Sequence, residues 1–130
     1  MKRVLFGVLM MVCSVAWAEW AFVGKTDDHS FFVDKSTKRK NGNIVKMWAL
    51  RDYSSVQISG ELKYSSTVIL YAYDCKEEAA AIVSISGYVG AMGSGNVVQT
   101  ETHQQREWDW QPVIPGSIGR TQWEIACGKQ

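Results

Sequence analysis

Cys75 and Cys127 are the residues with the most specific chemistry in the sequence, and both lie well beyond the apolar N-terminal segment. If that segment is removed on export, they are an even pair in an oxidising compartment, which predicts one disulfide. The bridge would close a loop of about 50 residues, worth about 4 kcal/mol in the chain-entropy relation. Two buried free thiols are the alternative. A catalytic cysteine is disfavoured because pairing removes the thiolate.

A cationic run is the first candidate binding feature. It has four cations close together beside a predicted hairpin turn at Asn41-Gly42: Lys35, Lys38, Arg39 and Lys40. A hairpin tip with this charge is suited to an acidic glycan, an anionic lipid headgroup or an acidic protein patch. An ordinary solubilising loop is the competing interpretation.

Trp108-Asp109-Trp110 is the second candidate binding feature. Two indoles close together can stack on a sugar or anchor a protein partner. If the segment is extended, alternation places both rings on one side. The competing interpretation is that at least one ring closes the core under the chain leading to the C-terminus.

Residues suited to catalysis or metal binding are few. His29 and His103 are the only histidines, and each lies in a polar stretch typical of a solvated surface. Three adjacent residues such as Asp27-Asp28-His29 rarely converge on one metal ion. The sequence therefore predicts a protein that is not an enzyme and has no metal and no cofactor. A pocket in which either histidine meets acidic side chains would revive the enzyme hypothesis.

The N-terminus has the layout of an export signal. A cationic Met1-Lys2-Arg3 precedes an apolar run over 4–15 and a small-residue Ala16-Trp17-Ala18 site. We therefore expect residues 1–18 to be a cleaved signal peptide and 19–130 to be one domain, without a transmembrane segment in the mature chain. Val12 makes a poor lipidation context for Cys13, although lipidation there stays open. The expected location is periplasmic or secreted, with surface display at the outer membrane as a further outcome.

Charge and length restrict the function further. Without residues 1–18 the chain has 12 basic and 13 acidic side chains. A net charge near −1 argues against a general nucleic-acid binder. The remaining length suits a single compact core.

Most of the mature chain has the pattern of β-strands. Runs of β-branched and aromatic residues, with alternation in several of them, predict strands over 20–23, 31–33, 43–53, 67–73, 81–89 and 96–102. Turn residues at Asn41-Gly42 and Gly93-Ser94-Gly95 are short connections, so neighbouring strands should be antiparallel. Within 81–89, Val83 and Ile85 are expected on one face.

The C-terminal segment changes to a helical pattern. Ser117 is placed as an N-cap, 118–127 as a helix with one broad apolar side, and Gly128 as its end. A disulfide from Cys127 to Cys75 would tie this helix to a strand. The predicted fold class is therefore α+β, a six-stranded antiparallel sheet with a C-terminal helix packed on one face and tethered by a disulfide.

The ordered motifs resemble the bacterial surface-adhesin protein E family over the whole mature chain. They are Trp20, Phe-Phe-Val-Asp at 31–34, Gly-Asn-x-Val-x-x-Trp at 42–48, Asp74-Cys75, Met-Gly-x-Gly at 92–95, Trp108, Pro-Val-x-Pro-Gly-Ser at 112–117 and Cys127. The resemblance implies the same fold and an exported, non-enzymatic adhesin that can form a homodimer. Its partner would be an extracellular or envelope protein or glycan. A periplasmic inhibitor or small-ligand-binding protein is the alternative function.

Overall fold

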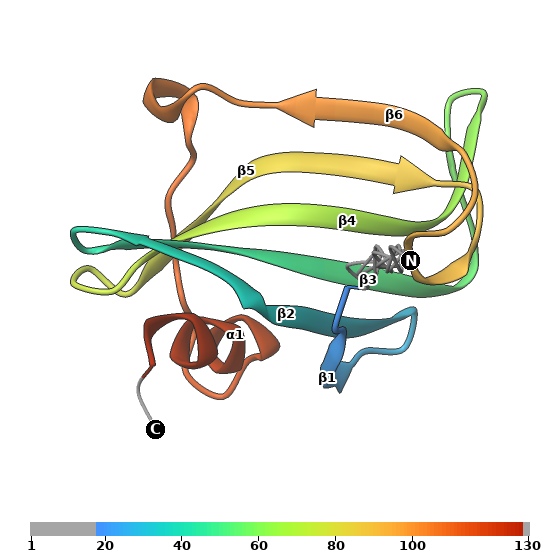
Figure 1. The fold of residues 1–130 in the computed structure, drawn as a ribbon. Coiled ribbons are helices and arrows are strands. Elements are labelled where there is room, and N and C mark those ends of the chain that lie inside the picture. The colour runs from blue at the N-terminus through green and yellow to red at the C-terminus, as the bar shows by residue number, and fades with distance from the viewer. Residues whose placement is uncertain (1–17, 129–130) are drawn as a thin grey trace, which may run out of the picture.

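The computed structural model describes residues 18–128, which form one curled antiparallel sheet and a C-terminal helix (Figure 1). The strands follow one another in chain order: β1 Ala21–Lys25, β2 His29–Asn41, β3 Ile44–Ser59, β4 Leu62–Asp74, β5 Ala79–Tyr88 and β6 Val97–Thr102. The helix α1 is Ile118–Cys127. The predicted α+β fold with six antiparallel strands is confirmed. The predicted signal peptide and Cys13 lie outside the described residues, apart from Ala18.

Three short elements complete the chain. They are the single turns η1 Ala91–Gly93 and η2 Gln105–Glu107, and the two-residue strand β7 Gln111–Pro112. β6 pairs with one end of β5, from Ser84 to Tyr88, whereas β7 pairs with Ala79 and Ala80 at its other end. From β6 the chain therefore descends across one end of the sheet to reach α1 (Figure 1).

Several strands are longer than the sequence indicated. β2 continues to Asn41, so the cationic run is the arm of a hairpin and not a loop at its tip. The turn itself is confirmed, with Gly42 at φ 60°. β3 and β4 extend to a polar turn at Gly60, where cross-strand hydrogen bonds continue beyond the apolar pattern.

The main core lies between the sheet and α1. We call the covered side of the sheet the helix face. Its buried residues are Phe31, Val33, Val45, Met47, Ala49, Ile69, Tyr71 and Tyr73 from the strands, with Trp123 and Ala126 from α1. The opposite face buries Leu50, against which η1 lies closely enough that a Cβ on Gly93 would be 3.2 Å from the Leu50 side chain. β3 is thus apolar on both faces, as a central strand should be.

The alternation expected in β5 is interrupted. Its pairing with β4 shifts between Leu70 and Tyr71, so Ile82 pairs with Tyr71 while Ile85 pairs with Ile69. This bulge brings Ile82 to the helix face with Ile85. The prediction that Val83 shares a face with Ile85 is therefore wrong.

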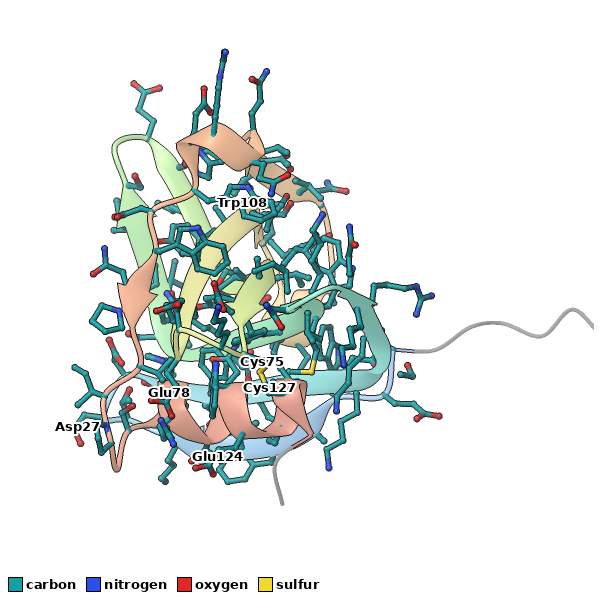
Figure 2. The ribbon with its side chains drawn as sticks, turned by 90° about the vertical axis from the view of Figure 1, so that its left-hand side faces the viewer. Asp27, Cys75, Glu78, Trp108, Glu124 and Cys127 are labelled. Carbon is teal, nitrogen blue, oxygen red and sulfur yellow. A yellow bond between two sulfur atoms is a disulfide. The ribbon has the colours of Figure 1, made fainter. Side chains whose placement is uncertain are left out.

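The C-terminal helix has the predicted limits and the predicted bridge. Ser117 caps it by accepting a hydrogen bond from the Arg120 N–H at 3.1 Å, and Gly128 ends it at φ 69°. Cys75 and Cys127 form the disulfide, with their Cα atoms 5.6 Å apart (Figure 2). Trp123 is fully buried and its indole N–H donates to the Asp74 carbonyl at 2.9 Å. The helix is thereby held at the same end of β4 by a covalent bond, a hydrogen bond and packing.

Candidate functional site

The tryptophans of the second candidate feature form a pair. The ring centroids of Trp108 and Trp110 are 5.8 Å apart in an edge-to-face arrangement. The Trp108 indole N–H donates to the His103 carbonyl at 3.1 Å, which fixes that ring against the chain. Trp110 keeps 36% of its surface exposed. Both rings therefore lie on one side of the segment, as alternation predicted, and one of them remains available to solvent.

Lys46 joins the tryptophan pair to the cationic hairpin. Its ammonium lies 5.3 Å from the centroid of the Trp108 ring. Val45 and Met47 on either side of it are buried under the helix, so alternation along β3 points Lys46 to the opposite face. Arg39 is the direct cross-strand partner of Lys46 and shares that face. We call Arg39, Lys46, Trp108 and Trp110 the cationic-aromatic surface.

The four predicted cations do not act as one cluster. Arg39 belongs to the cationic-aromatic surface, whereas Lys40 pairs with Val45 and therefore lies on the helix face. Lys35 and Lys38 fall in the stretch where the β2–β3 register shifts, and neither has an ion pair among the described residues. The reason is that the run lies along a strand, and a strand sends successive side chains to opposite faces. The cations therefore lie along the hairpin arm on both faces of the strand, and a binding role for Lys35, Lys38 and Lys40 stays a prediction.

Arg39 and Lys46 are two like charges placed directly opposite each other, and neither has a counter-ion among the described residues. Like charges directly opposite each other across two strands are destabilising. The ion pairs of the described chain involve only His29 and Arg120 as cations, so neither Arg39 nor Lys46 is neutralised. An anionic partner would relieve this repulsion.

His29 and His103 both line an open pocket on the helix face of the sheet. The pocket has a volume of about 850 Å³, and Glu101, Glu107 and Asp109 also line it. This arrangement meets the condition that would revive the enzyme hypothesis, so the contacts of the histidines decide the matter. His103 has no side-chain hydrogen bond or ion pair within residues 18–128.

The hydrogen bonds around His29 are unlike those of a catalytic triad. Thr26 Oγ1 lies 3.1 Å from His29 Nδ1, and Asp28 Oδ1 lies 2.7 Å from the same nitrogen. In a triad the nucleophile and the carboxylate contact different ring nitrogens. One nitrogen accepts the proton of the nucleophile, and the N–H of the other donates to the carboxylate, which orients the ring. Thr26 also donates to Asp28 at 2.6 Å, and these contacts lower the pKa of the Asp28 carboxyl. The three residues therefore stabilise the β1–β2 turn.

The described residues contain neither a metal-binding cluster nor a membrane-spanning helix. Between Ala18 and Gly128 no group of three histidine, cysteine or acidic side chains converges as a metal site. In the same range, no helix has the length and hydropathy to cross a bilayer.

The sequence reasoning missed Lys46 and the pocket. Lys46 was assigned to an apolar strand, and the single lysine within that strand was the available signal. The pocket is formed by residues from β2 to α1 that only the fold brings together, so no local pattern could indicate it.

Solved structures of other proteins share the fold described above. A comparison with curated protein sequences finds no match. A structure of Haemophilus influenzae protein E aligns with a TM-score of 0.61 and 12% identity, over 82% of this chain and 83% of that one. Its crystal form II gives 0.59 and 13% identity, over 75% and 80%. A structure from a non-typeable strain gives 0.58 and 12%, over 87% and 79%. At these identities the likeness establishes the fold alone.

The match to a family model is more specific than the structural likeness, because it depends on the amino-acid sequence. The model for surface-adhesin protein E matches residues 20–128, which includes every described strand and the helix. Such a family indicates an exported or surface-displayed, non-enzymatic protein that binds host or envelope molecules. It favours this function over the inhibitor alternative. The chain belongs to the surface-adhesin protein E family.

Proposed function

We propose that this protein is an exported, non-enzymatic binding module that holds an acidic glycan on its cationic-aromatic surface. The observation that carries the proposal is the position of Lys46, which pairs with Arg39 across the strands and lies over Trp108. The glycan would belong to a host or envelope surface, in keeping with the family.

An acidic sugar fits both halves of this surface. Its carboxylate or sulfate groups would neutralise Arg39 and Lys46, whose repulsion has no internal counter-ion. Its ring would stack on Trp110, the more exposed indole. A partner with only one of these features would leave the other half of the surface unused.

The experiment is a binding titration with a heparin-derived octasaccharide, compared with a neutral maltooligosaccharide of similar length. Lys46→Ala and Trp110→Ala should each weaken octasaccharide binding about tenfold. Lys63→Ala, an exposed lysine of β4, and Phe22→Ala, with an aromatic ring 61% exposed, are the matched controls. Binding should also weaken as salt rises.

Three results would contradict the proposal. Equal losses of octasaccharide affinity in Lys63→Ala and Lys46→Ala would show that binding depends on overall positive charge and not on this surface. Equal affinity for the neutral sugar would remove the role of the cations. Retained binding of an acidic protein, without binding of the octasaccharide, would assign the surface to a protein partner.

The family resemblance supports two further proposals. The mature protein is periplasmic, secreted or displayed at the surface, which cell fractionation with mass analysis of the N-terminus tests. It also forms a homodimer, for which sedimentation in solution is the test.

A further inference from the structure

The helix-side pocket has the composition of a small-ligand site. Its walls are mostly apolar, with Phe31, Tyr71, Ile82 and Ile85 from the sheet and Val113 and Ile118 from the chain that leads into α1. A volume of about 850 Å³ lies within the range of natural ligand pockets. The pocket opens on the helix face, whereas Arg39 and Lys46 lie on the opposite face of the sheet.

Among the residues that the structure describes, Arg51 is the one permanent positive charge that lines this pocket. Its Nη2 donates to the Tyr71 hydroxyl at 2.7 Å, and its guanidinium lies 5.7 Å from the Phe31 ring centroid. Its Nε is buried without a hydrogen-bond partner. No carboxylate of residues 18–128 lies within 4.0 Å of it.

The neighbouring tyrosine does not supply the missing negative charge. Burial raises the pKa of the Tyr71 hydroxyl, so it stays neutral at ordinary pH and accepts the Arg51 hydrogen bond without supplying a negative charge. A half-buried guanidinium without a counter-ion is costly to keep. A carboxylate is the group whose geometry matches it best.

The other end of the pocket has the opposite charge. Glu101 on β6, and Glu107 and Asp109 beyond it, line the pocket. None of these carboxylates forms an ion pair within the described chain. β3 and β6 are three strand spacings apart, about 14 Å along the sheet.

The ligand that fits this pocket has a carboxylate at one end, a cation at the other and an apolar body between them. A simple fatty acid would meet three uncompensated carboxylates, and a simple amine would leave Arg51 unpaired. An extended peptide spans about 3.3–3.6 Å per residue, so about four residues would bridge the two ends.

We propose that the helix-side pocket binds a short apolar peptide with free termini, its carboxylate on Arg51 and its ammonium at Glu101, Glu107 and Asp109. This site goes beyond the glycan-binding function and does not depend on it.

Calorimetric titration of the unmodified protein with the tetrapeptide Ala-Leu-Ala-Leu tests the proposal. The free peptide should bind, and both amidation of its carboxylate and acetylation of its amine should weaken binding about tenfold. In Arg51→Gln, amidation should no longer matter, and in Glu101→Gln acetylation should matter less. Glu61→Gln, at the exposed β3–β4 turn, is the matched control.

Three results would overturn the proposal: no binding at about 1 mM peptide, equal affinity of the free and blocked peptides, or tighter binding of decanoate than of the peptide. The blocked peptides keep the test valid if Arg51→Gln fails to fold. Lys46→Ala should leave peptide binding unchanged, so failure of the glycan proposal and failure of this one are distinguishable.

Discussion

Replacing Cys75 and Cys127 with alanine should destabilise the protein by an amount that the fold allows us to work out. The two residues are 52 positions apart in the chain. In the unfolded state, a crosslink over that distance removes about 14 cal/mol/K of conformational entropy, or about 4 kcal/mol at 25 °C. The double variant should lose this amount of free energy of unfolding.

The loss should arise mainly in the unfolded chain, because other contacts hold α1 in place. Trp123 is fully buried and bonded to the Asp74 carbonyl at 2.9 Å. Arg120 bridges Glu78 at 2.8 Å and Glu124 at 3.2 Å, on the flank of the helix shown in Figure 2. The helix should therefore remain docked in the folded variant.

The expected change in melting temperature follows from the size of the domain. An unfolding entropy near 2.1 cal/mol/K per residue gives roughly 0.23 kcal/mol/K for the folded residues 18–128. A loss of about 4 kcal/mol then corresponds to a Tm about 17 °C lower.

Guanidinium unfolding followed by circular dichroism and tryptophan fluorescence is the assay. The oxidised protein, the double variant and the reduced protein are compared, and the last two should agree. A loss below about 1 kcal/mol would refute the loop-entropy reasoning. Loss of helical signal before denaturant is added would refute the claim that these non-covalent contacts keep α1 docked without the disulfide.

Three further predictions concern local stability. Ser117→Ala should cost about 1 kcal/mol in denaturant titration, because it removes the N-cap acceptor, and an unchanged midpoint would contradict this. Gly93→Ala should cost roughly 1–3 kcal/mol in the same assay. Gly93 has φ 71°, and a new Cβ there would lie 3.2 Å from the Leu50 side chain. An unchanged stability would contradict this close approach. Burial raises the pKa of Tyr71 and, more strongly, of Tyr73. The folded chain therefore keeps protons that the unfolded chain releases above about pH 10, and the free energy of unfolding should fall there by about 1.4 kcal/mol per pH unit for each tyrosine. Tyr73→Phe should halve that slope, and a flat profile up to about pH 11 would contradict the assignment.

Local chemistry predicted the parts of the fold that local interactions determine. Ser117 and Gly128 mark the helix ends through their own backbone and side-chain preferences, and Gly42 marks a turn in the same way. The lengths of β2 and β3 were underestimated, because polar hairpin arms are held by cross-strand hydrogen bonds that hydropathy does not record. The β5 bulge at Val83, opposite Leu70 and Tyr71 of β4, arises from pairing between strands and has no sequence pattern of its own.

The candidate site was predicted only in part, for the same reason. Trp108 and Trp110 were found because they are close in the sequence, whereas the contact of Trp108 with Lys46 spans about half of the chain. Arg39 was found within a charged run, but its face depends on the register with β3. Arg51 lies in the same strand as Lys46 and on the other face, where only the complete sheet forms a pocket around it.

The central claim is that the cationic-aromatic surface is where this adhesin-family protein binds its partner. An NMR titration with the heparin-derived octasaccharide tests it most directly, by following the backbone amides and the indole N–H groups. The largest shifts should fall on Trp110, Lys46 and Arg39, while Arg51 in the pocket should not respond. Shifts confined to the pocket, or to the β1 edge around Phe22, would contradict the account.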